Sequence, residues 1–204
     1  MTLHESVCQA LRDWPAPDAD QDSLREAVLG FVLARPDACR RACEPGHITA
    51  SALVLDHTRT RVLLTLHPRL RRWVQLGGHC EDVDHDIRSA ALREATEESG
   101  ISGLELSAAP AALHVHALTC SLGLPTRHLD MQYLAYAPAD AEIACSDESL
   151  DLQWWPLAAL PDPDPGMVRL ARAAQSLLQG GSDVRGVTNP AVRDGDTRPH
   201  PGST

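Results

Sequence analysis

Short apolar runs, some alternating with polar residues and all bounded by turn residues, occupy the middle of the chain and predict β-strands. The predicted strands span residues 47–56, 61–67, 113–119, 129–137 and 152–157, with a further short strand at Trp73. A polar turn at 56–60 joins the first two strands, and a turn-rich stretch at 122–125 separates the next pair. The pattern therefore predicts a sheet built mainly from neighbouring short strands.

Helical spacing of apolar residues appears on both sides of these strands. We expect a short helix over residues 5–13, followed by a proline-rich linker, and a second helix from about residue 22 to residue 34. A third, amphipathic helix is expected over 167–178. The first two helices read as an extension that packs on the domain formed by the strands.

The pattern divides the chain into an N-terminal helical extension (1–44), an α/β domain of the α+β kind (45–179) and a tail (180–204). The tail is rich in Gly, Pro, Asp, Arg and Thr and has almost no large apolar residue. Such a segment cannot bury enough surface to offset the entropy of ordering. We therefore expect the tail to be disordered.

Composition narrows the possible functions. With 204 residues, 43% of them hydrophobic, the chain supports one ordinary domain with a true core. Its formal net charge of −10 argues against broad binding to a nucleic-acid backbone but is compatible with a small phosphorylated ligand bridged by metal. The six cysteines form no C-x-x-C pair, and neither a signal peptide nor an 18-residue apolar run is present. We expect a reduced, cytoplasmic protein away from membranes; homodimer formation stays open.

An acidic cluster in a predicted helix carries the strongest chemical signal. Glu94, Glu97 and Glu98 fall within an arc of roughly 100° on a helix, so three carboxylates share one face. Most such clusters are solvated faces. Here, however, a Gly-Gly turn follows a strand, and Gly100 ends the helix. Carboxylates that repel each other in this setting favour a hard divalent cation as their partner.

The segment from residue 77 to residue 101 resembles the Nudix box, G-x5-E-x7-R-E-U-x-E-E-x-G-U, where U is aliphatic. Residues 93–101 fit its second half at every fixed position, with Ala95 as the aliphatic residue. In the first half, counted forward from Gly78, Asp84 stands where Glu is expected, and one extra residue separates it from Arg93. The ungapped alternative would place histidines on the Gly and Glu positions, so we adopt the gapped alignment.

The resemblance covers roughly residues 44–180. The stretches that look like those of a bacterial Nudix subgroup whose box begins Gly-Gly-His are GHITASALVLD, WVQLGGHCE, HLDMQYLAY and SDESLDLQWWPLAALP. The resemblance implies an α/β/α sandwich with a mixed sheet, and pyrophosphohydrolase activity on a nucleoside diphosphate linked to another moiety, with Mg²⁺ or Mn²⁺ as cofactor. The metal ligands implied are Glu94, Glu97, Glu98 and the carbonyl of Gly78. Arg93 is implied to orient Glu94, and the residue at position 84 to steady the loop and this arginine.

The general base is left open. In this family it comes either from the box helix or from a distant loop, where Glu148 precedes the last predicted strand. Glu97 or Glu98 would otherwise serve through a metal-bound water, and Glu148 would then be a cap or a plain surface carboxylate.

Histidines form the second unusual feature. His114 and His116 lie two apart on one predicted strand, and His128 and Asp130 repeat the spacing on the next, so each pair faces one side of the sheet. Antiparallel neighbouring strands would make the pairs converge. The alternatives are contact with substrate or phosphate, a second metal site, and satisfied structural histidines. His79 is a further candidate for metal, phosphate or loop contact, and His47, at the start of the first strand, is a weaker one.

Arg72, with the neighbouring Arg69 and Arg71, precedes the glycine loop and is a candidate for substrate phosphate, against the alternative of a solvated loop. Two other functions stay open beside hydrolysis of a nucleotide. One is a catalytically silent Nudix-fold module that binds a nucleotide-like ligand, which the intact box argues against. The other is a Nudix enzyme acting on a non-nucleotide diphosphate.

Overall fold

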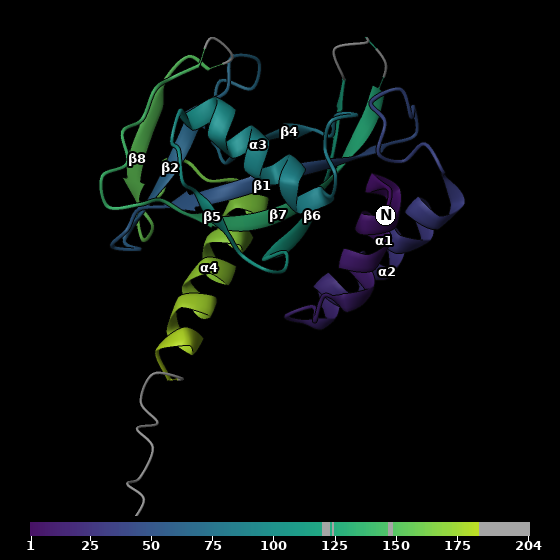
Figure 1. Ribbon diagram of the computed structural model, residues 1–204, viewed down its shortest axis with the longest axis horizontal. Coiled ribbons are helices and arrows are strands. Elements are labelled where there is room, and N and C mark those ends of the chain that lie inside the picture. The colour runs from purple at the N-terminus through teal and green to yellow at the C-terminus, as the bar shows by residue number, and fades with distance from the viewer. Residues whose placement is uncertain (120–122, 124, 147–148, 184–204) are drawn as a thin grey trace, which may run out of the picture.

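The computed structural model describes residues 1–119, 123, 125–146 and 149–183, with side chains described as far as residue 179 (Figure 1). Four helices and eight strands follow one another in the described chain. They are α1 (Leu3–Asp13), α2 (Ala19–Ala34), β1 (His47–Leu55), β2 (Arg61–Leu66), β3 (Trp73–Val74), β4 (Leu76–His79), α3 (Ile87–Ser99), β5 (Glu105–Leu106), β6 (Ala112–Thr119), β7 (Pro125–Tyr136), β8 (Leu152–Pro156) and α4 (Pro165–Asp183).

All eight strands belong to one mixed sheet centred on β1, which is buried along its whole length. Strand β1 pairs in parallel with β7, from His47 opposite His128 to Leu55 opposite Tyr136. The other pairings are antiparallel: β2 and β4 with β1, β3 and β8 with β2, and β5 and β6 with β7. The predicted α+β fold with a mixed sheet is therefore confirmed.

Alternation along β1 assigns the two faces of the sheet to different helices. Ile48 and Ala50 share a buried cluster with residues of α3, which crosses the sheet at β1 in Figure 1. Leu53 and Leu55 point the other way and pack with residues of α4. The polar residues His47, Thr49 and Ser51 have the same parity as Leu53 and so lie on the α4 face.

The N-terminal helices pack on the domain, as predicted. Val7 and Val28 lie in the same core cluster as Ile48 of β1. Gln21, only 1% exposed, binds both backbone groups of Leu113 on β6: its Nε2 donates to the carbonyl (3.2 Å) and its Oε1 accepts from the N–H (2.7 Å). Moving α2 away would leave the buried amide of Gln21 and the backbone groups of Leu113 without partners. These contacts therefore fix α2 against the edge of the sheet.

The structure adjusts several predicted boundaries. The single strand predicted at Trp73 is two short strands, β3 and β4, and the two-residue β5 is too short to give a periodic signal. Helix α4 continues to Asp183, so it extends four residues past the predicted end of the domain at residue 179. The helix is anchored by buried Leu170 and Ala174, and extending an anchored helix costs little. The remainder of the predicted tail, 184–204, lies outside the described residues.

No helix in the described part of the chain is both long enough and apolar enough to cross a membrane.

Candidate active site

The glycine loop lies on β4, which pairs with the middle of β1. Gly77 has φ +150°, and a Cβ there would lie 2.4 Å from the Cβ and 2.5 Å from the Cα of Ser51 and 2.6 Å from the carbonyl oxygen of Ala50. Two of these atoms belong to the backbone of a buried strand and cannot move aside. Glycine is therefore required at position 77 for β4 to reach β1.

This close approach gives a stability prediction. Gly77→Ala should lower the free energy of unfolding by at least about 2 kcal/mol, because it adds both a backbone clash and an unfavourable φ. The matched control is Gly30→Ala in the exposed part of α2, where no atom lies within 4 Å of the added Cβ. That change should raise stability by about 0.5–1 kcal/mol through helix propensity. Urea unfolding followed by circular dichroism measures both; an unchanged midpoint for Gly77→Ala would contradict the prediction.

Helix α3 presents the acidic face toward this loop. Asp86 caps the N-terminus of the helix, where its side chain accepts from the backbone N–H of Ser89 (2.7 Å), and Gly100 caps the C-terminus in the left-handed conformation, φ 70°. Ala91 and Ala95 are fully buried against the sheet. Small residues on the inner face bring the helix axis close to the strands, so residues on the adjoining face of α3 reach β4.

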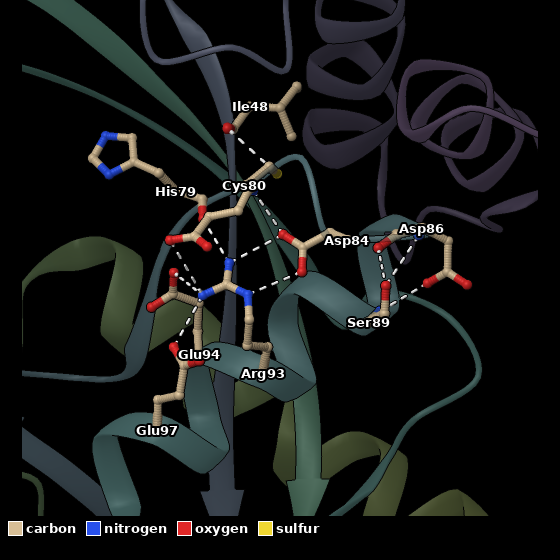
Figure 2. A network of polar contacts seen from close by, with 10 residues as sticks. Ile48, His79, Cys80, Asp84, Asp86, Ser89, Arg93, Glu94 and Glu97 are labelled. Carbon is tan, nitrogen blue, oxygen red and sulfur yellow. Dashed lines mark hydrogen bonds and ion pairs between the residues drawn. The ribbon is translucent and has the colours of Figure 1, made fainter.

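Arg93 holds the parts of the site together (Figure 2). Its Nε and Nη2 donate to the two carboxylate oxygens of Asp84 at 2.9 and 3.0 Å, and Nη2 also donates to the carbonyl of His79 at 3.0 Å. Its Nη1 donates to Glu94 at 3.1 Å and to Glu97 at 3.0 Å. The hydrogen bonds with Asp84, followed by the nearby carboxylate charges, raise the pKa of Arg93 above its ordinary value. One guanidinium thus links the loop, the end of β4 and two acidic residues of α3.

Asp84 is the buried half of this network. Burial of its side chain, 2% exposed, would by itself raise its pKa, but the hydrogen bonds from Arg93 and from the backbone N–H of Glu81 outweigh this effect and leave the pKa below the usual value. The carboxylate is therefore ionised and grips Arg93 with both oxygens. This contact is the one that the gapped alignment of the box predicts for position 84.

Two of the three glutamates lie against the glycine loop, and the third is linked to it through Arg93. Glu98 accepts a hydrogen bond from the backbone N–H of Gly77 at 3.0 Å. Glu94 approaches Gly78 so closely that a Cβ there would stand 2.8 Å from its Oε2. Glu97 is tied to Arg93, as is Glu94. The carboxylates predicted as metal ligands are thus brought to the loop whose Gly78 carbonyl is the fourth predicted ligand.

This donor set suits a hard divalent cation. Carboxylate and carbonyl oxygens are the ligands that Mg²⁺ and Mn²⁺ prefer, and Mg²⁺ commonly keeps several waters beside one or two carboxylates. The missing side chain at Gly78 allows the Glu94 carboxylate to lie directly against the loop. The residues present therefore fit the cofactor that the box resemblance implies.

The histidines converge on the other side of β4. His116 lies opposite His128 and His114 opposite Asp130 in the antiparallel pair β6 and β7, as expected if the strands are neighbours. Ring centroids are 5.3 Å apart for His114 and His116 and 5.2 Å apart for His116 and His128. Sequence reasoning gave little weight to His47, yet its ring lies 4.9 Å from that of His128.

His79 belongs to this group as well. Its ring lies 5.1 Å from that of His47 and 4.9 Å from that of His128, and Figure 2 shows it directed away from Arg93. Burial lowers the pKa of His79 to about 4 and that of His128 to about 3, so both rings are neutral at physiological pH. Neutral rings can bind a metal or share a proton in a hydrogen bond, but they provide no charge for phosphate.

Beyond the histidines, the same face of the sheet carries a buried carboxylate. Asp130, 4% exposed, accepts hydrogen bonds from Thr49 (3.1 Å), Ser51 (2.7 Å), Gln75 (3.3 Å) and Gln132 (3.1 Å). In the sequence, most of these residues appear as polar side chains at every second position of β1 and β7, which are otherwise apolar. This pattern alone does not predict that they meet, because the register between strands far apart in the chain must also be known.

One predicted site residue, Arg72, contacts a different part of the fold. Arg72 donates to the backbone carbonyl of Asp162 at 3.0 Å and lies 4.0 Å from the carboxylate of Asp164, so it contacts the segment that leads into α4. Its predicted contact with substrate stays a prediction. Glu148 lies outside the described residues.

The chain is similar to known proteins in both sequence pattern and fold. A family model described as the NUDIX domain matches residues 45–175. No curated protein matches the chain. An Ap4A hydrolase from C. elegans, in a binary complex, has a TM-score of 0.51 and 21% identity, over 65% of this chain and 98% of the other. The NUDIX domain of NrtR from Shewanella oneidensis, complexed with ADP ribose, has a TM-score of 0.51 and 21% identity, over 73% and 97%. At this identity the structural likenesses show a shared fold.

Proposed function

Because the chain belongs to the Nudix family of hydrolases, we propose that it cleaves a phosphoanhydride bond in a nucleoside diphosphate linked to another moiety, or in a related organic diphosphate, with Mg²⁺ or Mn²⁺ as cofactor. The observation that carries the proposal is the network at Arg93, which holds Glu94 and Glu97 beside the glycine loop while Glu98 binds the same loop. A cluster maintained only for solubility would not need a buried Asp84 behind its arginine.

Each group in the network has a distinct task in this reaction. Asp84 fixes the guanidinium of Arg93, and Arg93 in turn sets the positions of the Glu94 and Glu97 carboxylates. The backbone N–H of Gly77 orients Glu98. A cation held by these carboxylates and by the Gly78 carbonyl would neutralise phosphate oxygens and make water a better nucleophile at neutral pH. Glu97, Glu98 and Glu148 are the candidates to accept the proton from that water.

The test is a substrate panel. Metal-free protein is incubated with Mg²⁺ or Mn²⁺ and with nucleoside triphosphates, ADP-ribose, dinucleotides, coenzyme A, and sugar or isoprenoid diphosphates, and the products are separated by chromatography. We expect turnover of at least one compound, dependent on added metal. Tight binding of a panel member with no product from any would reject hydrolysis and favour the silent binding module.

Two observations bear on the alternatives. The NUDIX domain of NrtR was crystallised with ADP ribose, so a domain of this fold holds a nucleotide-like ligand. A silent binding module, however, would have no need of the complete set of Arg93, Glu94, Glu97 and Glu98. The sugar and isoprenoid diphosphates in the panel separate a nucleotide substrate from a non-nucleotide one.

The role of Glu148 can be tested separately. Glu148→Gln should lower kcat by at least about 100-fold with KM nearly unchanged if this residue takes the proton from water. Glu142→Gln, an exposed glutamate in the same connecting segment, is the matched control and should leave kcat unchanged. A near-normal kcat for Glu148→Gln would show that Glu148 is not the general base and would leave Glu97 or Glu98 as the candidates.

The cytoplasmic location, the possible homodimer and the lack of nucleic-acid backbone binding stay predictions from the sequence.

A further inference from the structure

Three histidines from three strands meet at one corner of the sheet. His47 on β1 lies directly opposite His128 on β7. His79 on β4 lies opposite Thr49, two residues from His47 and therefore on the same face. One ring nitrogen from each of these histidines lies within 4.8 Å of the others. Register alone brings the three imidazoles together, although they are far apart in the sequence.

Two ring nitrogens at this corner are buried and have the lone pairs that a metal ion would bind. His47 is 1% exposed, and its Nδ1 lies 3.3 Å from the carbonyl oxygen of Cys43. A carbonyl only accepts, so Nδ1 carries the proton and Nε2 presents a lone pair. Nε2 of His47 and Nε2 of His128 are both buried and have no hydrogen-bond partner in the described part of the chain. A backbone carbonyl on one ring nitrogen, with a lone pair on the other, is the usual arrangement of a metal-binding histidine.

We propose that His47, His79 and His128 form a binding site for a borderline-soft divalent transition metal, of which Zn²⁺ is the representative. Imidazole nitrogen suits such ions, whereas the carboxylates of α3 suit Mg²⁺. Tetrahedral Zn–N bonds of about 2.0–2.1 Å place the nitrogens about 3.3–3.4 Å apart, so metal binding would draw the three nitrogens closer by at most about 1.5 Å. His116, whose Nδ1 is buried and has no partner among the described residues, lies beside His128 and is the candidate for a fourth ligand.

An anion is the competing occupant. Burial, and to a smaller extent the positive charge of Arg41, lowers the pKa of His47, His79 and His128, and that charge would help to bind phosphate. The proton on Nδ1 of His47 decides in favour of the metal, because Nε2 then has no hydrogen to donate to a phosphate oxygen. Arg41 accordingly weakens the metal site without abolishing it.

The site is joined to the carboxylate network through one residue. The ring of His79 belongs to the three-histidine site, whereas its backbone carbonyl accepts from Nη2 of Arg93 at 3.0 Å. A metal on the ring would hold the end of β4, and with it the carbonyl that Arg93 binds. The proposal itself concerns binding and does not rest on hydrolysis.

Chelator-treated full-length protein is titrated with Co²⁺, whose tetrahedral complexes absorb visible light, and then with Zn²⁺ by calorimetry in excess Mg²⁺. We expect one Co²⁺ per chain, displaced by Zn²⁺. His47→Ala and His128→Ala should each weaken Zn²⁺ binding by at least about 100-fold. His57→Ala, an exposed histidine in the turn after β1, and Glu98→Gln should leave it unchanged.

Several results would overturn the proposal. Absence of visible Co²⁺ absorption with the wild-type protein would overturn it. This measurement needs no variant, so it still decides the question if a histidine variant fails to fold. Zn²⁺ affinity that is lost in Glu98→Gln but kept in His128→Ala would place the ion on the carboxylates instead. Arg41→Ala should strengthen Zn²⁺ binding several-fold by removing a like charge; inorganic phosphate binding that Arg41→Ala abolishes would identify an anion site.

Discussion

Glu98→Gln should lower kcat by at least about 100-fold while leaving the free energy of unfolding almost unchanged. The amide oxygen of glutamine still accepts the hydrogen bond from the N–H of Gly77, so the loop keeps its partner. The negative charge, which both metal binding and acceptance of a proton require, is lost. Initial rates over a range of Mg²⁺ concentrations, with thermal unfolding in parallel, measure the two effects.

Glu105→Gln provides the matched control for that change. It makes the same substitution at an exposed position of β5 and should leave kcat within about twofold of wild type. Glu97→Gln should resemble Glu98→Gln, although Glu97 also has an ion pair with Arg93 to lose. Wild-type rates in both Glu97→Gln and Glu98→Gln would refute the placement of the metal on α3.

Arg93→Met should lower the free energy of unfolding by about 3–5 kcal/mol, because it leaves the carboxylate of Asp84 buried without its partner. Adding Asp84→Asn removes the unpaired charge and should recover a large part of the loss. The matched control is Arg61→Met: Asp56, the partner of Arg61, keeps hydrogen bonds from the backbone N–H groups of Thr60 and Arg61. That control should cost only about 1 kcal/mol. Urea unfolding in chelator-containing buffer keeps bound metal out of the comparison.

The effect of Arg93→Met should depend on pH with a definite sign. In wild type the pKa of Asp84 is below its value of about 3.9 in the unfolded chain, so its stabilisation is present above that pH and is lost as pH falls through the folded pKa. In Arg93→Met, burial raises the pKa of Asp84. The contribution of Asp84 to the stability of the variant is therefore present at low pH and is lost as pH rises through this raised pKa. The difference between wild type and variant should therefore shrink from pH 7 to pH 4.5. An equal difference at both pH values would show that the lost packing of Arg93, and not the charge of Asp84, sets the cost.

The box and its helix could be predicted from sequence because their information is local. Gly100 ends α3 in the left-handed conformation that glycine favours, and the spacing of Glu94, Glu97 and Glu98 fixes the acidic face of α3 wherever the helix lies. The role of Asp84, which stands where the family pattern has Glu, could also be predicted. Its partner Arg93 lies only nine positions further along the chain, so the contact is local.

The three-histidine site could not be derived in the same way. The sequence predicts that His114 and His116 converge with His128 and Asp130 if their strands are antiparallel neighbours, and β6 and β7 pair in this way. His47 meets His128 only through the parallel pairing of β1 with β7, and no local pattern fixes that register. Arg72 is close to the glycine loop in sequence, and the fold also brings it to Asp162 and Asp164, so its contact with substrate stays a prediction.

The parallel pairing of β1 with β7 also has a consequence for how the protein acquires activity. These strands lie far apart along the chain, and pairings of that kind form slowly because a long loop must close first. Gly77 and Gly78 meet their partners Ser51 and Ala50 only on β1, itself stabilised by β7. A fragment that contains β4 and α3 alone would carry every residue of the box but none of this support. Metal-binding competence should therefore appear late in refolding, together with the global transition and not with the helix.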